Sequence, residues 1–356
     1  MKEGYMHPIP QHLRTLGLSA TVILALLQPQ ASQASNQNAL SNLPDEVTPM
    51  NTNAASRIIS HQTELPDLYG KIEQVKRRIE DKGDLPHATV SEQLEILNQV
   101  PDSSFGREIF LRAGITGVMT QRMCLHPVTP QNEPLSPLDD FLLNHAPSVK
   151  ATQQRFQIFK KLLQEEVREN VVMASCPCGT MDDLLGLDFT GINAYQLVGI
   201  DLAADSLDLA ADNARQHQQQ YHTEFMQQDA WHMDVENTFD VITSNGLNIY
   251  EPNNERVIDL YRAFYKALKP GGVLITSFLT PPPSAAGESP WKMARIDSEN
   301  LRRQRIFMAD LTQVQFMNFR SYEQTETQLF QAGFSDLIFH EDEANMFPTV
   351  IARKPS

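Results

Sequence analysis

Short apolar runs and longer amphipathic stretches alternate along the C-terminal half of the chain. The apolar runs have the length of strands, and they lie at residues 171–174, 196–200, 223–226, 239–245, 273–278, 337–340 and 349–353. Apolar residues at helical spacing predict helices at residues 206–217, 256–268 and 321–331. Strands that alternate with helices in this way predict an α/β protein with a largely parallel sheet, and the last two runs predict an antiparallel pair.

The preceding segment, residues 65–168, carries only the helical pattern. Thr89 and Glu92 have the spacing of a capping box, in which each side chain accepts from the backbone of the other residue. Further helices are predicted at residues 104–113, 116–125, 138–145 and 148–169. The pattern therefore predicts a helical subdomain in front of the α/β part.

The first residues of the chain have features of a targeting segment. Lys2 and Arg14 precede an apolar run at residues 16–27, which is too short to span a bilayer. Residues 28–64 are rich in Gln, Ser, Asn and Pro, a composition typical of a disordered linker. Two interpretations remain open: an export signal, or an upstream segment with little role in a cytoplasmic protein.

Composition excludes several classes of function. The chain of 356 residues has 41% hydrophobic residues, enough for a sizeable core, and a net charge of −15, which disfavours a non-specific nucleic-acid binder. The basic run at residues 302–305 is either a local basic patch or a solvated helix face. Three cysteines make neither a disulfide framework nor a four-ligand zinc site, so no metal is expected.

The richest local motif joins the first two predicted strands of the α/β part. The strand at residues 171–174 runs into a turn of small residues at 175–180, and the next strand ends in Asp201. Small residues let the backbone approach a ligand closely, and a carboxylate accepts hydrogen bonds from the two hydroxyls of a ribose. This layout is typical of a nucleotide-binding β-α-β unit.

From about residue 170 onward the chain resembles the class I S-adenosylmethionine (SAM)-dependent methyltransferases. Four features match in order: the turn Cys178-Gly179-Thr180, Asp201, the pair Asp229-Ala230, and Lys269-Pro270-Gly271-Gly272 before the fifth strand. The resemblance implies a seven-stranded Rossmann-like methyltransferase sheet whose last strand is antiparallel. It also implies that the N-terminal helices cover the cofactor. Residues 284–319 are longer than a simple connection needs, which predicts a helical cap over the acceptor site before the last helix.

The cofactor loop departs from the family pattern. Ser175, Pro177 and Met181 stand where the family usually has an acid and two glycines, which predicts a poorer cradle for the methionine end of SAM. Asp182 and Asp183 follow directly. They either meet the cationic cofactor or favour the dipole of a helix that begins there.

The resemblance assigns candidate site residues. Those expected to bind SAM are Ala174, Pro177, Cys178, Gly179, Asp201, Leu202, Asp229, Ala230, Asn245 and Gly246. Asn245, Asn248 and Tyr250 either orient the acceptor or the methionine end of SAM, or only form a hydrogen-bonded turn. Tyr250 and His126 are the candidate catalytic bases. Thr120, Arg122 and His126 are candidate acceptor contacts from the helical segment.

The sequence therefore predicts methyl transfer from SAM to a small molecule by in-line displacement, with the cofactor supplying the activated carbon. A protein substrate, a SAM-binding scaffold without catalysis and an interaction protein without SAM affinity are the alternatives. A nicotinamide enzyme is disfavoured because the Gly-x-Gly-x-x-Gly pattern is missing. The predicted units are a targeting-like or disordered segment at residues 1–64, a helical lid at 65–168 and the methyltransferase domain at 169–356. A cytoplasmic location, no stable membrane span and no nucleic-acid partner are expected.

Overall fold

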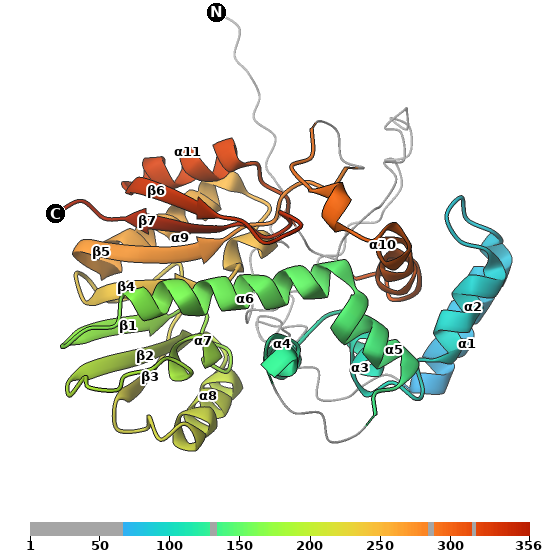
Figure 1. Ribbon diagram of the computed structural model, residues 1–356, viewed down its shortest axis with the longest axis horizontal. Helices are drawn as coiled ribbons and strands as arrows, with labels where there is room; N and C mark the ends of the chain where they lie inside the picture. Colours follow the sequence, from blue (N-terminus) through green and yellow to red (C-terminus); the bar gives the residue numbers. More distant parts are fainter. Residues whose placement is uncertain (1–66, 129–133, 284–287, 315–317) are drawn as a thin grey trace, which may run out of the picture.

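The computed structural model describes residues 67–128, 134–283, 288–314 and 318–356. The predictions for residues 1–64 lie outside this part of the chain, as do short pieces of the predicted cap. Figure 1 shows a sheet with flanking helices at one end of the molecule and a group of helices at the other.

One sheet of seven strands forms the α/β part, in the order β3-β2-β1-β4-β5-β7-β6. The strands are β1 (Val171–Ser175), β2 (Tyr195–Asp201), β3 (Thr223–Gln227), β4 (Phe239–Ser244), β5 (Leu268–Ser277), β6 (Ser335–His340) and β7 (Thr349–Arg353). The pairs among β1 to β5 are parallel, and β7 runs antiparallel to both of its neighbours. The predicted fold class, including the antiparallel last strand, is confirmed.

Two layers of helices cover the sheet. The helices of one face are α6 (Pro147–Glu165), α7 (Asp182–Leu185) and α8 (Ala204–Gln216), and those of the other are α9 (Asn254–Ala267) and α11 (Tyr322–Ala332). Alternate residues of a strand point to opposite faces, so Met173 packs with α6 while Ala174 packs with α9. Apolar runs without a polar alternation are what a sheet buried on both faces requires.

The fifth strand begins earlier than predicted. Leu268 already pairs with Phe239, and the register then shifts before Val273 pairs with Val241. Gly271 has φ of 77° within this irregularity. The predicted turn at residues 269–272 is therefore a bulge inside the strand, which glycine permits because it lacks a Cβ.

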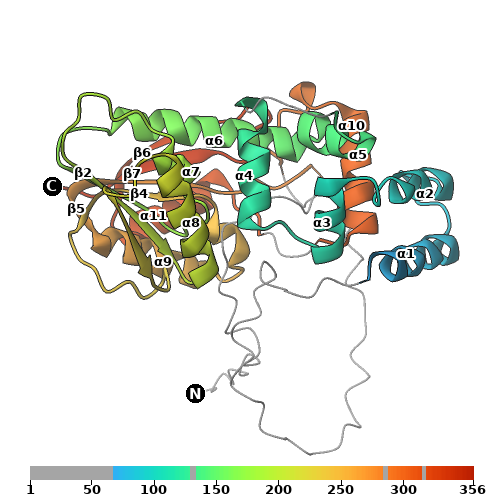
Figure 2. The ribbon, with the colours of Figure 1, turned by 90° about the horizontal axis from the view of Figure 1, so that it is seen from below.

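The second group of helices comes from two distant parts of the sequence. It contains α1 (Leu68–Lys82), α2 (Val90–Asn98), α3 (Ser104–Arg112), α4 (Gly117–Leu125), α5 (Pro137–Asp140) with the π-helical turn Phe141–His145, and α10 (Ser298–Arg305) with the π-helical turn Ile306–Leu311. Figure 2 shows α10 beside these N-terminal helices. The capping box of Thr89 and Glu92 is present at the start of α2. None of the helices in the described ranges is long and apolar enough to cross a membrane.

The basic run at residues 302–305 docks α10 onto the N-terminal helices. Arg302 forms an ion pair with Glu92 at 2.9 Å, and Arg303 lies over the ring of Phe141 at 4.4 Å. Both interpretations made from the sequence, a basic patch and a solvated face, are therefore wrong for Arg302 and Arg303. The hydrophobic core here joins α3 to the cap and to Phe347, which lies between β6 and β7.

Candidate cofactor and acceptor site

The loop after β1 is fixed to both neighbouring strands by its backbone. The Cys176 amide donates to the Thr243 carbonyl of β4, and the Cys178 amide donates to the Ile200 carbonyl of β2, each at 2.9 Å. Gly179 is buried and has φ of 51°, yet no atom lies within 4 Å of the position that a Cβ would occupy. A small internal space therefore opens beside Gly179, as a cofactor-binding loop requires.

Asp201 lies where β2 ends and faces this loop. Its buried carboxylate accepts from the Gly179 amide at 3.1 Å and from the Ala203 amide at 3.0 Å. A carboxylate has about four acceptor positions, and the hydroxyls of a ribose are donors of the kind that such an acid accepts from. Leu202, the next residue, is 42% exposed and offers an apolar surface beside the acid.

The residues that replace family glycines do not fill the space beside Gly179. Met181 has φ of 61° and buries its side chain in the core that includes Leu184 and Leu197. A non-glycine residue in the left-handed region costs about 1–2 kcal/mol. The structure of this loop is therefore compatible with a cofactor, although the prediction of a poorer cradle stays a prediction.

Asp182 and Asp183 hold the loop in place through hydrogen bonds of their side chains. Asp182 accepts from Thr180 Oγ1 at 2.6 Å, from Gln121 Nε2 of α4 at 2.9 Å and from Asn213 Nδ2 of α8 at 3.1 Å. Asp183 accepts from Ser175 Oγ at 3.0 Å, and burial raises its pKa to about 6. Both acids lie in the first turn of α7 with their carboxylates engaged by protein groups.

Helix α4 covers the loop, but its three candidate acceptor residues bond within the helical part. A Cβ on Gly117 would lie 3.9 Å from the Gly179 Cα. Thr120 Oγ1 donates to a carbonyl of its own helix, and Arg122 Nη1 donates to Ser104 Oγ of α3. His126 caps the far end of α4, about 13 Å along the axis from Gly117 at 1.5 Å per residue.

His126 Nε2 lies 2.9 Å from Asn144 Oδ1 in the adjacent π-helical turn. The structure thus places His126 at the opposite end of α4 from Gly117, and its role as a base stays a prediction.

Asp229 follows β3 at the same edge of the sheet. Its carboxylate accepts from the Trp231 amide at 3.0 Å and lies 2.9 Å from His232 Nδ1, while its side chain stays 42% exposed. Ala230 beside it is buried. Asp229 is therefore accessible to an adenine amine. Arg256 lies over the ring of Trp231 at 5.2 Å.

The loop after β4 presents polar atoms that have no protein partner. Asn245 Oδ1 and Asn248 Oδ1 are both buried without a hydrogen bond to any described residue, although Asn248 Nδ2 donates to the Tyr261 hydroxyl at 3.0 Å. Gly246 takes the turn with φ of 91°. A hydrogen-bonded turn alone does not account for these two oxygens, because buried polar atoms are normally satisfied.

Two buried arginines at this edge were missed from the sequence. Arg320 donates from Nη1 to the Asn248 carbonyl at 2.8 Å and from Nη2 to the Glu251 carbonyl at 2.5 Å, which fixes the loop after β4. Arg155 of α6 donates to Ser277 Oγ at the end of β5, at 3.3 Å. Burial lowers the pKa of Arg155 to about 10, and the nearby Cys124, Tyr250 and Asp342 act in the opposite direction. The sequence contains one sign that Arg155 is buried, because its spacing places it on the same helix face as the apolar residues Phe159 and Leu162.

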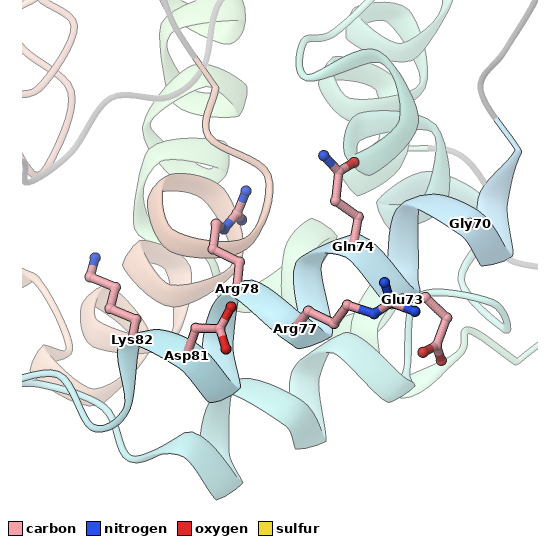
Figure 3. A pocket seen from close by; sticks show the side chains of 7 residues that line it. All are labelled: Gly70, Glu73, Gln74, Arg77, Arg78, Asp81 and Lys82. Atoms are coloured by element: carbon pink, nitrogen blue, oxygen red, sulfur yellow. The ribbon is translucent and has the colours of Figure 1, made fainter.

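Two open grooves lie away from these residues. One of about 700 Å³ runs along α1 and is lined by Gly70, Glu73, Gln74, Arg77, Arg78, Asp81 and Lys82. Its charged side chains project from a single helix (Figure 3). Another of about 940 Å³ lies between the outer face of α6 and the edge of β6. Within the part of the chain that the structure describes, no group of His, Cys, Asp and Glu could hold a metal ion.

Comparison with known proteins finds a methyltransferase domain and a similar solved structure. Residues 175–272 match the family model of a methyltransferase domain. The structure is similar to that of a protein from Bordetella parapertussis described as a possible exported protein, with 42% identity, 81% of this chain and 96% of that chain covered, and a TM-score of 0.77.

More distant similarity extends to two other solved structures. One is a SAM-dependent methyltransferase from Methanosarcina mazei (17% identity, 55% and 97% covered, TM-score 0.42), and the other is magnesium protoporphyrin IX methyltransferase from Synechocystis (13%, 67% and 94%, 0.44). No curated protein matches the chain. Residues 175–272, which include the cofactor loop and every strand from β2 to β4, therefore form a methyltransferase domain, and the chain belongs to one family with the Bordetella protein.

Proposed function

We propose that this enzyme transfers a methyl group from SAM to a small molecule that binds where β4 and β5 end. The observation that carries the proposal is the hydrogen bond between Asp201 and the Gly179 amide, with open space beside Gly179. It joins the two elements that hold the ribose and the methionine end of the cofactor. The family loop is altered, but this pairing is intact.

A small acceptor fits the burial of the groups at this edge. Arg155 is 1% exposed, and Asn248 and the cap residue Gln304 are equally buried. A protein substrate needs an open groove for an extended segment, whereas these groups lie inside the molecule. The enclosed polar groups therefore favour a small molecule over a protein segment.

The residues have distinct roles in this proposal. Asp201 binds the ribose, Leu202 packs on the adenine and Asp229 accepts from its amine. Asn245 orients the methionine end, and Tyr250, as its phenolate, is the base that takes the proton lost by the acceptor. SAM supplies a methyl carbon activated by its sulfonium, so the protein mainly aligns the reactants, which is worth roughly 7–11 kcal/mol in well-oriented systems.

We also propose that the enzyme works in the cytoplasm, where SAM is made. The description of the Bordetella relative as a possible exported protein is the counter-argument. Fractionation of cells that express the full chain tests the proposal, and recovery outside the cytoplasm would overturn it.

Calorimetric titration of the full chain with S-adenosylhomocysteine (SAH) tests the cofactor site. We expect micromolar binding by the wild type. Asp201→Ala removes about two charge-assisted hydrogen bonds to the ribose, roughly 3 kcal/mol together, and should weaken binding by about 100-fold. Asp208→Ala, which changes an exposed acid of α8, is the control and should bind as the wild type does. Absence of heat with wild-type protein at millimolar SAH would overturn the proposed function.

A further inference from the structure

Arg155 is a buried cation whose hydrogen-bonding capacity is almost unused. It is 1% exposed, its Nε has no partner, and its single hydrogen bond is that to Ser277 Oγ at 3.3 Å. A guanidinium has five N–H donors, so most of them remain unsatisfied by the described residues. Burying such a group without partners costs several kcal/mol, which indicates that another group completes the site.

The surroundings of Arg155 contain no direct counter-ion among the described residues. Phe347 stacks on it with 5.0 Å from the guanidinium carbon to the ring centroid. Asp342 interacts electrostatically with Arg155, but its carboxylate accepts hydrogen bonds from the backbone amides of Ala344, Met346 and Phe347. The positive charge therefore lacks a contacting carboxylate of the protein.

Arg320 is a second buried arginine at this sheet edge, and its terminal nitrogens are better paired. It is 3% exposed, and both of these nitrogens donate to carbonyl groups, those of Asn248 and Glu251, although its Nε, like that of Arg155, has no partner among the described residues. The contrast between the terminal nitrogens of the two arginines argues that Arg155 has a function other than bracing the fold.

Further unsatisfied polar groups lie along the same face of α6 and on the cap. Ser148, Thr152 and Arg155 follow at helical spacing, and Thr152 Oγ1 is buried without a partner. Ser148 donates from its amide and hydroxyl to Gln304 Oε1 of α10, which leaves Gln304 Nε2 buried without a partner. Arg155 and Gln304 thus offer free N–H donors, and a ligand rich in acceptor oxygens would satisfy them.

We propose that Arg155 binds a carboxylate of the methyl acceptor. This inference rests on the proposed function and names the substrate class of the same site. Ser277 belongs to β5, two strands from the cofactor loop after β1, a distance of about 10 Å at the usual strand spacing. Because this distance separates Arg155 from the loop assigned to the methionine end of SAM, the carboxylate of SAM is the less suitable partner.

Matched acids and amides test the proposal in the presence of saturating SAH. The probes are acetate with acetamide and 4-hydroxybenzoate with 4-hydroxybenzamide, measured as thermal shifts of the full chain at constant ionic strength. The wild type should be stabilised by at least one acid more than by its amide. Arg155→Met should abolish that preference, Arg155→Lys should retain part of it, and both variants should bind SAH within about twofold of the wild type.

Stability provides a second readout. Replacing a buried, poorly paired cation by an apolar side chain of similar volume is often neutral or stabilising, so Arg155→Met should melt no lower than the wild type without ligand. Arg320→Met, the control, removes the two hydrogen bonds to the Asn248 and Glu251 carbonyls and should lower Tm by roughly 4 °C or more.

The outcomes separate the two proposals. Equal effects of every acid and its amide on the wild type, or an acid preference that survives in Arg155→Met, overturn the carboxylate site. A tenfold loss of SAH affinity in Arg155→Met assigns Arg155 to the cofactor and overturns it as well. If the wild type binds no SAH but prefers acids through Arg155, the proposed methyl transfer fails and the carboxylate site stands.

Discussion

Asp183 should make the stability of this enzyme depend on pH in a direction opposite to most carboxylates. Its buried carboxyl has a pKa of about 6 in the folded protein, against 3.8 for an ordinary aspartate. The folded state therefore holds this proton more tightly than the unfolded chain. The stabilisation is complete below about pH 3.8 and is lost as pH rises through about 6, because the unfolded state then binds fewer protons.

The size of the effect follows from the two pKa values. Between about pH 8 and about pH 5 the titration of Asp183 contributes about 1.4 kcal/mol to the free energy of unfolding. Asp183→Asn removes the titration and keeps an oxygen that accepts from Ser175 Oγ. The difference in unfolding free energy, wild type minus variant, should therefore be about 1.4 kcal/mol larger at the lower pH.

Urea unfolding of both proteins at the two pH values measures this double difference, in which the other titrating groups cancel. Asp188→Asn is the control, because the exposed Asp188 accepts from Thr190 and its pKa is lowered. For that pair, the difference should be nearly equal at both pH values, because Asp188 is ionised in the folded and the unfolded state throughout this pH window. A wild-type minus Asp183→Asn difference that is equal at both pH values, or smaller at about pH 5, would refute the reasoning.

Three further substitutions probe the loop, the helical part and the cap. Gly179→Ala should lower the free energy of unfolding by about 1 kcal/mol, because the φ of Gly179 is 51°. It should also weaken SAH binding more than tenfold by calorimetry, since the added Cβ enters the open space beside the loop. An unchanged SAH affinity would contradict this placement of the cofactor. Asp139→Ala removes the carboxylate that accepts from three amides at the start of α3. It should lower the free energy of unfolding, measured in urea, by about 3 kcal/mol or more, and Asp139→Asn should lower it less. Arg302→Ala breaks partly exposed pairs with Glu92 and Glu299 and should cost no more than about 1 kcal/mol, with SAH binding unchanged.

The sheet and the position of Asp201 at a strand end could be predicted because their signals are local. A strand buried on both faces shows as a continuous apolar run, and Asp201 stands where such a run ends. The capping box of Thr89 and Glu92 likewise needs only three residues of spacing. The candidate residues at the strand ends, Asp201 and Asn245 among them, follow from the rule that parallel strands meet ligands at their carboxyl ends.

The side-chain pairing of the site could not be predicted, because it joins segments that are distant in sequence. Arg155 meets Ser277 122 residues later, and Arg320 meets Asn248 72 residues before it. Asp182 looked like a ligand contact or a helix-dipole acid, and only the packing of α4 shows that Gln121 engages it. The environment of a charge run such as residues 302–305 is equally ambiguous. A charged helix face has the same sequence pattern whether water or another helix covers it.

The continuity of α6 limits how this enzyme can admit its reactants. The helix has 19 residues, about 28 Å of rise, and its first half is buried in the core of the helical part while its second half is buried against the sheet. A rotation of the helical part relative to the sheet would therefore have to bend α6. We therefore expect the two parts to tumble as one body and access to depend on smaller displacements, such as that of α4 over Gly179.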